Sequence, residues 1–591
     1  MKTYHFIGLG GIGMSALARL LLQQGEKVQG SDLAMSSLLK ELEQEGALIQ
    51  IGHGVESMDE ASVVVYSSAI SETHVEMMRA KELKLPILHR SELLDQLMQG
   101  KKTLLVTGTH GKTTTSGLLA HVLSQAEFDP TFVVGGILAA LQTNSRAGTG
   151  DYFVAESDES DGSFLKTAAF GAIVTNLEND HLDYWKDPEN LDQAFAQFFS
   201  QVKNQKSLFW CADDVRLSAL HPLGQSYGFS AAADWQIKEF SQTNQGARFH
   251  LMQGEKIYFA IETSLFGKHN ALNAAAVFAL AMSLGAKENL IRQGLNSFAG
   301  VLRRFEFKGE KHGVQVFDDY GHHPTEIAAT LSALRGKIGQ KRLVAVFQPH
   351  RYTRVRDLAE EFLHCFDEAD EVVLTDIYSA GEEPIEGVTS AALYTRMRER
   401  LGGKLHFVSH ANLDIGIAHM LMPHDVVMTI GAGDITQMGK PILDCFSQKA
   451  PKWVIGLVFD KNSFASAQLL FSGLDRTIYS VRLFGITEDG DWIEGEDCFE
   501  KIKHNIRLSF GVPKISPQVF QEILQCQIIF PLPQGIQGLF DVLKIPYADC
   551  NFLGCDSMAG DIDSLNSVQE NCSLKLKEHC DRLAITALRV V

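Results

Sequence analysis

The chain has 591 residues, of which 45% are hydrophobic and 21% are charged. This composition is typical of a globular protein, and the length exceeds a single hydrophobic core, so we expect about three to five domains. The formal net charge of −19 argues against a general nucleic-acid or anionic-membrane binder. No stretch approaches the roughly 20 apolar residues that span a bilayer, and no signal-peptide cleavage pattern follows the apolar N-terminus. We therefore expect a cytoplasmic protein without membrane insertion.

The first part of the chain alternates strand and helix signals around a G-x-G-x-x-G turn at residues 8–13. This pattern predicts a Rossmann-like half-sheet, whose glycines let a diphosphate approach the backbone. Asp32 lies at about the distance expected for an acid that binds a ribose hydroxyl. Taken alone, the turn favours an NAD-dependent oxidoreductase, or a tight turn without any ligand. We expect strands at residues 4–7, 28–30 and 63–66 and a helix at residues 15–22.

A second glycine-rich turn, at residues 107–112, joins an apolar strand pattern to a helical one. Strand, turn and helix in this order direct backbone N–H groups and the positive end of the helix dipole at a phosphate. Lys112 would reach the terminal phosphates and the Thr113 hydroxyl would contact Mg²⁺. Val106 replaces the first glycine of the usual phosphate-loop pattern, so an ordinary turn with a solvated lysine is the alternative. One dinucleotide does not need two such loops, which weakens the oxidoreductase interpretation.

Two further buried strands, expected at residues 152–155 and 172–177, each end in an acidic cluster. Open α/β sheets bind ligands at the carboxyl ends of their strands. Glu156 and His181 are therefore candidates to join Thr113 around a divalent cation, although histidine is an unusual ligand for Mg²⁺. The other acids of these clusters are equally typical of helix caps or of a solvated rim.

An Ala-rich helix, expected at residues 267–284, carries two asparagines near its start. Asn270 and Asn273 are three residues apart, so they share one face of the helix. The sequence leaves two roles open for them, contact with a nucleotide base or capping of the helix.

The following segment has four strand patterns that each end in a polar or glycine-rich cluster, so one edge of this sheet faces a site. Histidines and arginines at strand ends suit the binding of a carboxylate or a phosphate. Any single one of them is also compatible with an ordinary loop position. We expect these strands at residues 314–317, 343–347, 372–374 and 426–430.

Taken together, these motifs resemble the Mur ligases over about the first 450 residues. The stretches that carry the resemblance are GLGGIGMSALA, YSSAI, TGTHGKTTT, AESDESD, NLENDHLD, HNALNAAA, GVLRRFE, DDYGHHPTE, QPHRYTR and GAGD. A phosphate loop without the first glycine is usual in that family. DDYGHHPTE and QPHRYTR point to the member that adds L-alanine. The resemblance implies an α/β protein with three domains, a Rossmann-like UDP-binding domain (1–99), a central P-loop ATPase-like domain (100–298) and a Rossmann-like C-terminal domain (299–448).

The resemblance implies an ATP-dependent ligase of peptidoglycan precursor synthesis, which joins L-alanine to the carboxylate of UDP-N-acetylmuramate through an acyl phosphate. ATP and Mg²⁺ are the implied cofactors, and we expect a monomer or a weak homodimer. A non-catalytic nucleotide-binding relative is the remaining alternative. The implied UDP-sugar residues are Gly10, Gly11, Ile12, Asp32, Ser67 and Ser68. The implied ATP residues are Gly108, Thr109, His110, Gly111, Lys112, Thr113, Thr114, Asn270 and Asn273.

The implied chemistry brings two anions together, so the site must neutralise charge. Lys112, Mg²⁺ and Arg304 are the candidates for this task. The alanine amine must be neutral to attack the acyl carbon, and we predict His322 as its base. The implied metal ligands are Thr113, Glu156 and His181, with His181 also counted as catalytic. On the amino-acid and carboxylate side the resemblance implies Asp319, Tyr320, Arg351 and Arg354.

Residues 452–591 depart from this family. The stretches VIGLVF, LFGITEDGDW and IQGLFDVLKIPYA resemble the amino-terminal domain of D-alanine–D-alanine ligases. The Gly-Gly…Glu-His turn of that family is replaced by Asp-Lys-Asn-Ser at residues 460–463, and its central and ATP-grasp domains are missing. We therefore expect an incomplete α/β domain without D-Ala–D-Ala ligase activity.

Overall fold

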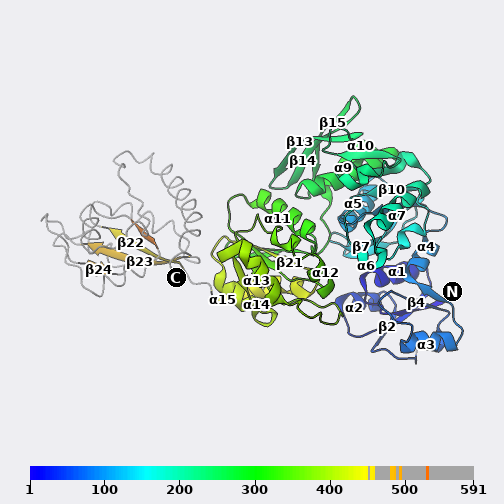
Figure 1. The fold of residues 1–591 in the computed structure, drawn as a ribbon, viewed down its shortest axis with the longest axis horizontal. Helices are drawn as coiled ribbons and strands as arrows, with labels where there is room; N and C mark the ends of the chain where they lie inside the picture. The colour runs from blue at the N-terminus through cyan, green and yellow to red at the C-terminus, as the bar shows by residue number, and fades with distance from the viewer. Residues whose placement is uncertain (57, 450–452, 460–478, 487–491, 495–527, 531–591) are drawn as a thin grey trace.

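The computed structural model contains three consecutive α/β domains, each built on its own sheet (Figure 1). The structure describes residues 1–56, 58–449, 453–459, 479–486, 492–494 and 528–530. Among these residues, no helix combines the length and apolar character needed to cross a membrane.

The first domain is a sheet of five strands in the order β3-β2-β1-β4-β5, and all neighbouring strands run parallel. This arrangement confirms the predicted Rossmann-like sheet. The helix after the glycine turn begins at Ile12, earlier than predicted, because Gly11 acts as its N-cap. The strands are β1 (Thr3–Ile7), β2 (Lys27–Asp32), β3 (Leu48–Ile51), β4 (Val63–Tyr66) and β5 (Ile87–His89). The helices are α1 (Ile12–Gln23), α2 (Ser37–Gln44), α3 (Val75–Glu82) and α4 (Arg90–Met98).

The central domain has a ten-stranded sheet in the order β15-β14-β13-β12-β11-β10-β6-β9-β7-β8. Its middle strands are parallel, and β14, β15 and β8 pair antiparallel at the two edges. The strands are β6 (Lys102–Thr107), β7 (Thr131–Leu138), β8 (Thr143–Arg146), β9 (Tyr152–Glu156), β10 (Gly171–Val174), β11 (Leu208–Cys211), β12 (Gln225–Gly228), β13 (Trp235–Thr243), β14 (Gly246–Gln253) and β15 (Lys256–Thr263). The helices are α5 (Lys112–Gln125), α6 (Leu182–Trp185), α7 (Pro188–Gln201), α8 (Val215–Ala219), α9 (Lys268–Ser283) and α10 (Glu288–Ser297).

Helix α5 is deeply buried, because the sheet, α9 and α10 all pack against it. Gly294 of α10 makes this approach possible, since a Cβ there would lie 2.9 Å from the Val122 Cα of α5. The residue that begins α5 is Lys112, so this packing fixes the phosphate loop at its C-terminal side. Strand β10 ends at Val174, earlier than predicted, since Thr175 and Asn176 turn toward the backbone of that loop.

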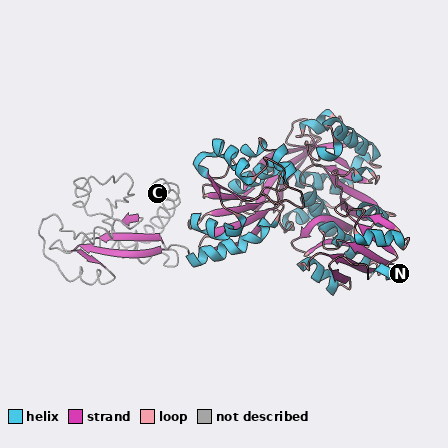
Figure 2. Ribbon diagram, turned by 60° about the horizontal axis from the view of Figure 1, so that its bottom comes forward, coloured by secondary structure: helices cyan, strands magenta, loops and turns pink. Residues whose placement is uncertain are grey.

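The third domain has six strands in the order β16-β17-β21-β18-β19-β20, with β16 alone antiparallel among them. Helices cover both faces of its sheet (Figure 2). Alternate residues of β18 enter two separate cores, as expected for a strand buried on both faces. The strands are β16 (Glu306–Lys311), β17 (Val314–Asp319), β18 (Leu343–Phe347), β19 (Glu371–Leu374), β20 (Leu405–Phe407) and β21 (Val426–Ile430). The helices are α11 (Pro324–Ile338), α12 (Tyr352–Asp357), α13 (Ser390–Leu401), α14 (Leu413–Met420) and α15 (Gly439–Lys449).

Beyond the third domain the structure describes one four-stranded sheet in the order β24-β23-β22-β25. Strands β22, β23 and β25 are parallel neighbours, whereas β24 pairs antiparallel with β23. The remaining residues of the predicted 452–591 domain, including the 460–463 turn, lie outside the described residues. The strands are β22 (Trp453–Phe459), β23 (Tyr479–Ile486), β24 (Trp492–Glu494) and β25 (Ile528–Phe530).

Candidate active site

A cavity of about 700 Å³ lies between the central and third domains. Residues of the phosphate loop and of α9 line one side, and residues that flank β16, β17 and the start of α11 line the other. The lining includes the predicted residues His110, Gly111, Thr114, Asn270, Asn273, Arg304 and Asp319. The structure therefore brings two separately predicted sets of polar residues to one site.

The phosphate loop has the backbone that its glycines allow. Gly108 has φ +123°, and a Cβ there would lie 2.3 Å from the Thr175 Oγ1. Gly111 has φ +79° and forms the N-cap of α5. Asn176, which the sequence reasoning missed, clamps the loop, since its Oδ1 accepts from His110 N at 2.7 Å and its Nδ2 donates to His110 O at 3.0 Å. Its place directly after a buried strand was the available signal.

Lys112 is held by a carboxylate from a different strand end. Its Nζ lies 2.8 Å and 3.0 Å from the two carboxylate oxygens of Glu159 and donates to Gly108 O at 2.7 Å. Burial lowers the pKa of Lys112, but Glu159 and Asp158 outweigh burial and raise that pKa above its ordinary value. The lysine is therefore a cation. The Glu159 carboxylate binds the Lys112 ammonium group at the position where a phosphate would be expected to bind it. The sequence did not predict this ion pair.

The three predicted metal ligands fall into two groups. Thr113 Oγ1 donates to Glu156 Oε1 at 3.1 Å, so these two lie together as predicted. His181 instead joins Asp158 and Glu159, with ligand atoms all within 4.8 Å of one another. A hydroxyl beside a carboxylate fits the oxygen preference of Mg²⁺, and His181 belongs to the adjacent cluster around Lys112. The assignment of all three to metal ions stays a prediction.

Both asparagines of α9 line the cavity on one face of the helix, as their spacing predicted. Asn270 Nδ2 donates to Phe266 O at 2.8 Å, and Asn273 Nδ2 donates to Asn270 Oδ1 at 3.1 Å. Gly267 is the N-cap and makes no side-chain cap hydrogen bond. The geometry thus favours contact with a ligand in the cavity over capping of the helix.

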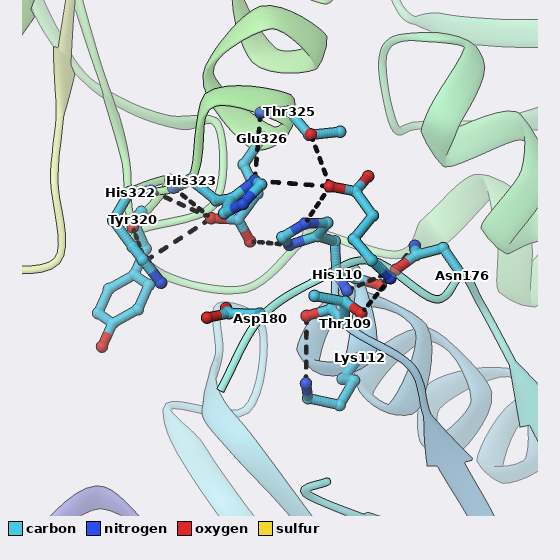
Figure 3. Close-up of polar contacts among 12 residues, drawn as sticks. Thr109, His110, Lys112, Asn176, Asp180, Tyr320, His322, His323, Thr325 and Glu326 are labelled. Atoms are coloured by element: carbon cyan, nitrogen blue, oxygen red, sulfur yellow. Dashed lines mark hydrogen bonds and ion pairs between the residues drawn. The ribbon is translucent and has the colours of Figure 1, made fainter. Parts of the chain in front are cut away.

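His110 connects the phosphate loop to the third domain (Figure 3). Its Nε2 lies 3.3 Å from Glu178 Oε2, and its Nδ1 lies 3.3 Å from Glu326 Oε1 of α11. Burial lowers the pKa of His110, but hydrogen bonds to Glu178 and Glu326 outweigh it and raise the pKa to about 9. Thr325 adds a second link between the domains, because its hydroxyl donates to Glu178 Oε2 at 2.8 Å.

Arg304 lies on a loop that Asp319 holds in place. The Asp319 carboxylate accepts from the backbone N–H groups of Phe305 and Gly321, each at 2.8 Å. Burial raises the pKa of Asp319 to about 6, although the neighbouring Arg304 acts in the opposite direction. The Arg304 guanidinium lies 5.0 Å from the centre of the Tyr320 ring. Asp319 therefore supports the arginine loop through its backbone, and its predicted place beside the amino acid stays a prediction.

His322 and His350 are both neutral in this environment. Burial lowers the pKa of His322 to about 3, with Arg354 adding to the effect, and lowers the pKa of His350 to about 4. His322 Nδ1 lies 3.2 Å from Tyr320 O and therefore carries the ring proton, which leaves Nε2 as an acceptor. Arg354 Nη1 donates to His350 Nδ1 at 3.3 Å. Arg351, the N-cap of α12, has a positive φ of +67°.

The predicted UDP-sugar residues gather at the carboxyl edge of the first sheet. Gly10 N donates to Asp32 Oδ2 at 2.8 Å, which joins the glycine turn to the end of β2. Ser67 and Ser68 directly follow β4, the other neighbour of β1, and Ser68 Oγ lies 3.0 Å from His89 Nε2. Ile12 is 41% exposed at the start of α1. These residues stay the predicted diphosphate site, and none of them lines the cavity between the central and third domains.

Fold and site together define a multidomain nucleotide-dependent enzyme, with a phosphate loop on one domain and an arginine-bearing sheet edge on the next. Family models match in the same order: the Mur ligase family catalytic domain at residues 3–102, the Mur ligase middle domain at 106–281 and the Mur ligase glutamate ligase domain at 303–433. The chain belongs to the Mur ligase family. The three-domain fold predicted from the motifs is confirmed.

Comparison with individual proteins shows which members of the Mur ligase family this chain resembles. The chain is 47% identical over 441 residues to UDP-N-acetylmuramate–L-alanine ligase of Protochlamydia amoebophila. This alignment covers 74% of this chain and 97% of that protein. It is 37% identical over 559 residues to the bifunctional enzyme MurC/Ddl of Chlamydia pneumoniae, covering 92% of this chain and 68% of that protein. This second alignment extends past the three Mur ligase domains, in agreement with a Ddl-related extension. The crystal structure of the UDP-N-acetylmuramate–alanine ligase of Thermotoga maritima superposes with a TM-score of 0.66 at 27% identity, covering 76% of this chain and all of that one.

Proposed function

We infer that the protein is an ATP-dependent ligase that joins L-alanine to the carboxylate of UDP-N-acetylmuramate in peptidoglycan precursor synthesis. The observation that carries this inference is that His110 of the phosphate loop and Arg304 of the third domain line one cavity, in a chain 47% identical to a ligase of that name. A phosphate loop facing a cationic sheet edge suits the transfer of a phosphoryl group to a carboxylate.

The first step forms a bond between a carboxylate oxygen of the sugar and the γ-phosphorus of ATP, and breaks the bond to the ADP oxygen. Two anions approach each other, so cations must lie on both sides of the transferred group. Lys112 supplies a positive charge from the loop, and Arg304 supplies one from the third domain. Thr113 and Glu156 are the residues that would hold Mg²⁺, which supplies further charge neutralisation when bound.

In the second step the alanine nitrogen attacks the acyl carbon and phosphate leaves. We predicted His322 as the base for this amine, and its pKa of about 3 changes the detail of that proposal. A group this weakly basic does not store a proton from an ammonium ion. We propose that L-alanine enters with its amine already neutral, that neutral His322 orients this amine through its Nε2, and that the departing phosphate takes the N–H proton lost as the amide forms. Arg351 and Arg354 remain the candidates for binding the alanine carboxylate.

Phosphate release from ATP tests this function. With Mg²⁺ present, we expect release that requires both UDP-N-acetylmuramate and L-alanine. Release with neither acceptor, or none with both, would contradict the ligase. A change in nicotinamide absorbance without phosphate release would favour the oxidoreductase alternative instead. D-alanine alone should give no release, because we expect no D-Ala–D-Ala ligase activity from residues 452–591.

A further inference from the structure

Glu326, at the start of α11, is a buried carboxylate that contacts three functional segments at once (Figure 3). Its Oε1 lies 3.3 Å from His110 Nδ1 of the phosphate loop and 3.6 Å from Arg304 Nη1. Its Oε2 accepts from His322 N at 3.0 Å and lies 3.6 Å from His322 Nδ1. The phosphate loop, the arginine loop and the histidine of the amine side therefore share one anionic partner.

The charges around Glu326 keep it ionised. Burial would raise its pKa, but the positive charges of His110 and Arg304 outweigh burial and lower the pKa well below its ordinary value. The side chain is only 11% exposed, so its attraction to these groups is weakly screened by solvent. A carboxylate in this position holds its cationic partners in a fixed geometry. These side chains therefore lose little conformational entropy when a ligand binds.

We propose that Glu326 is a positioning residue for phosphoryl transfer, whose single carboxylate holds His110 of the phosphate loop and Arg304 of the third domain in one arrangement. This proposal rests on the proposed ligase function. His110 lies on the central domain and Glu326 on the third, so their contact forms only when the two domains meet. Because His110 and Arg304 share this carboxylate, they are placed together toward the phosphates. The site is therefore complete only when the central and third domains are in contact.

Glu326 also belongs to a capping box with His323 at the N-terminus of α11. Replacing it can therefore destabilise the helix as well as remove the contacts to His110 and Arg304. Glu326→Gln retains an oxygen that can accept the backbone N–H groups and removes the charge. The chain offers a matched control in α4, where His89 and Glu92 form the same capping box away from the cavity. Glu92→Gln therefore measures the change in unfolding temperature that follows from removing a capping-box charge alone.

We expect Glu326→Gln to lower kcat for alanine-dependent phosphate release by about 30-fold, since small misplacement of reacting groups costs up to about 100-fold. The KM for L-alanine should stay within about twofold, because the variant leaves the arginines of the amino-acid side unchanged. Its unfolding temperature should fall no further than that of Glu92→Gln. A kcat within about twofold of the wild type would overturn the proposal, as would a kcat loss matched by an equal loss of folded protein. An inactive wild-type protein would instead contradict the proposed function itself.

A double-mutant cycle separates positioning from a general structural effect. If Glu326 acts through His110, the loss of kcat in the double variant His110→Gln, Glu326→Gln should be smaller than the product of the two single losses. Losses that multiply would show independent action and would refute the proposed coupling across the domain boundary. The conservative variant Glu326→Asp keeps the charge on a shorter side chain, and we expect it to restore part of the lost kcat.

Discussion

Replacing Glu159 with glutamine should strengthen ATP binding, although it removes a buried ion pair. Lys112 and Glu159 have side chains only 13% and 2% exposed, and their closest atoms are 2.8 Å apart. ATP binding must exchange this carboxylate for a phosphate as the partner of the lysine. The carboxylate therefore stabilises the nucleotide-free protein more than the ATP complex.

The size of the effect follows from the contacts. A hydrogen bond to a charged group contributes about 1.5–3 kcal/mol, and glutamine keeps one uncharged acceptor for the lysine. We therefore expect Glu159→Gln to destabilise the nucleotide-free protein by about 2 kcal/mol relative to the complex, which corresponds to about 30-fold tighter ATP binding. The lysine also retains its hydrogen bond to Gly108 O at 2.7 Å, so the loop should stay folded.

Isothermal titration calorimetry with ATP in the absence of Mg²⁺ measures this change directly, and omitting the metal keeps any role of Glu159 near a cation out of the comparison. Thermal unfolding without nucleotide should show a lower transition temperature for the variant. Glu386→Gln, a change at an exposed loop residue, provides the charge-matched control. Unchanged or weaker ATP binding by Glu159→Gln would refute the idea that the carboxylate competes with phosphate for Lys112.

Three further predictions concern the same loop. Lys112→Ala should lower phosphate release by at least about 100-fold while the far-ultraviolet circular dichroism stays that of the wild type; a retained rate would favour a non-catalytic relative. Gly108→Ala should lower the unfolding free energy by about 2–3 kcal/mol, because φ is +123° and the new Cβ would lie 2.3 Å from Thr175 Oγ1, whereas Gly403→Ala, with open space around it, should have little effect; equal urea midpoints would contradict this account. His110 has its pKa raised from 6.5 to about 9 by Glu178 and Glu326, with His323 also facing it, so its contribution to stability is complete below pH 6.5 and disappears as the pH rises through about 9. Thermal unfolding from pH 6 to about 10 should show this loss in the wild type and not in His110→Gln.

Much of each domain could be predicted because local signals agree with the tertiary arrangement. Strand β18 was predicted at its observed bounds. Five consecutive apolar residues are typical of a strand buried on both faces, and here they coincide with the whole strand. The end of β10 was predicted too late, because Thr175 and Asn176 have the polarity of a loop but follow directly on apolar residues. In the structure the strand ends at Val174, and the side chains of Thr175 and Asn176 both donate to His110 O.

The candidate site divides in the same way. The asparagines of α9 were predicted to share a face, which follows from helical geometry, whereas their orientation toward the cavity depends on how α9 packs against α5. His181 was predicted beside Thr113 and Glu156, and the structure groups it with Asp158 and Glu159. Adjacent strand ends place several acids within reach of one cation, and sequence spacing does not specify which of them meet.

Local sequence patterns predict the phosphate loop, the order of the three domains and the polar strand ends, because glycine positions, apolar runs and helix starts depend on residues close together in the chain. Which charged groups form ion pairs and hydrogen bonds with one another depends on the tertiary structure. Lys112 pairs with Glu159, His110 pairs with Glu326 across a domain boundary, and Asp319 binds backbone N–H groups of the arginine loop. These contacts join segments far apart in sequence, and burial then sets the pKa of each group, so the protonation states that the chemistry needs arise only in the folded protein.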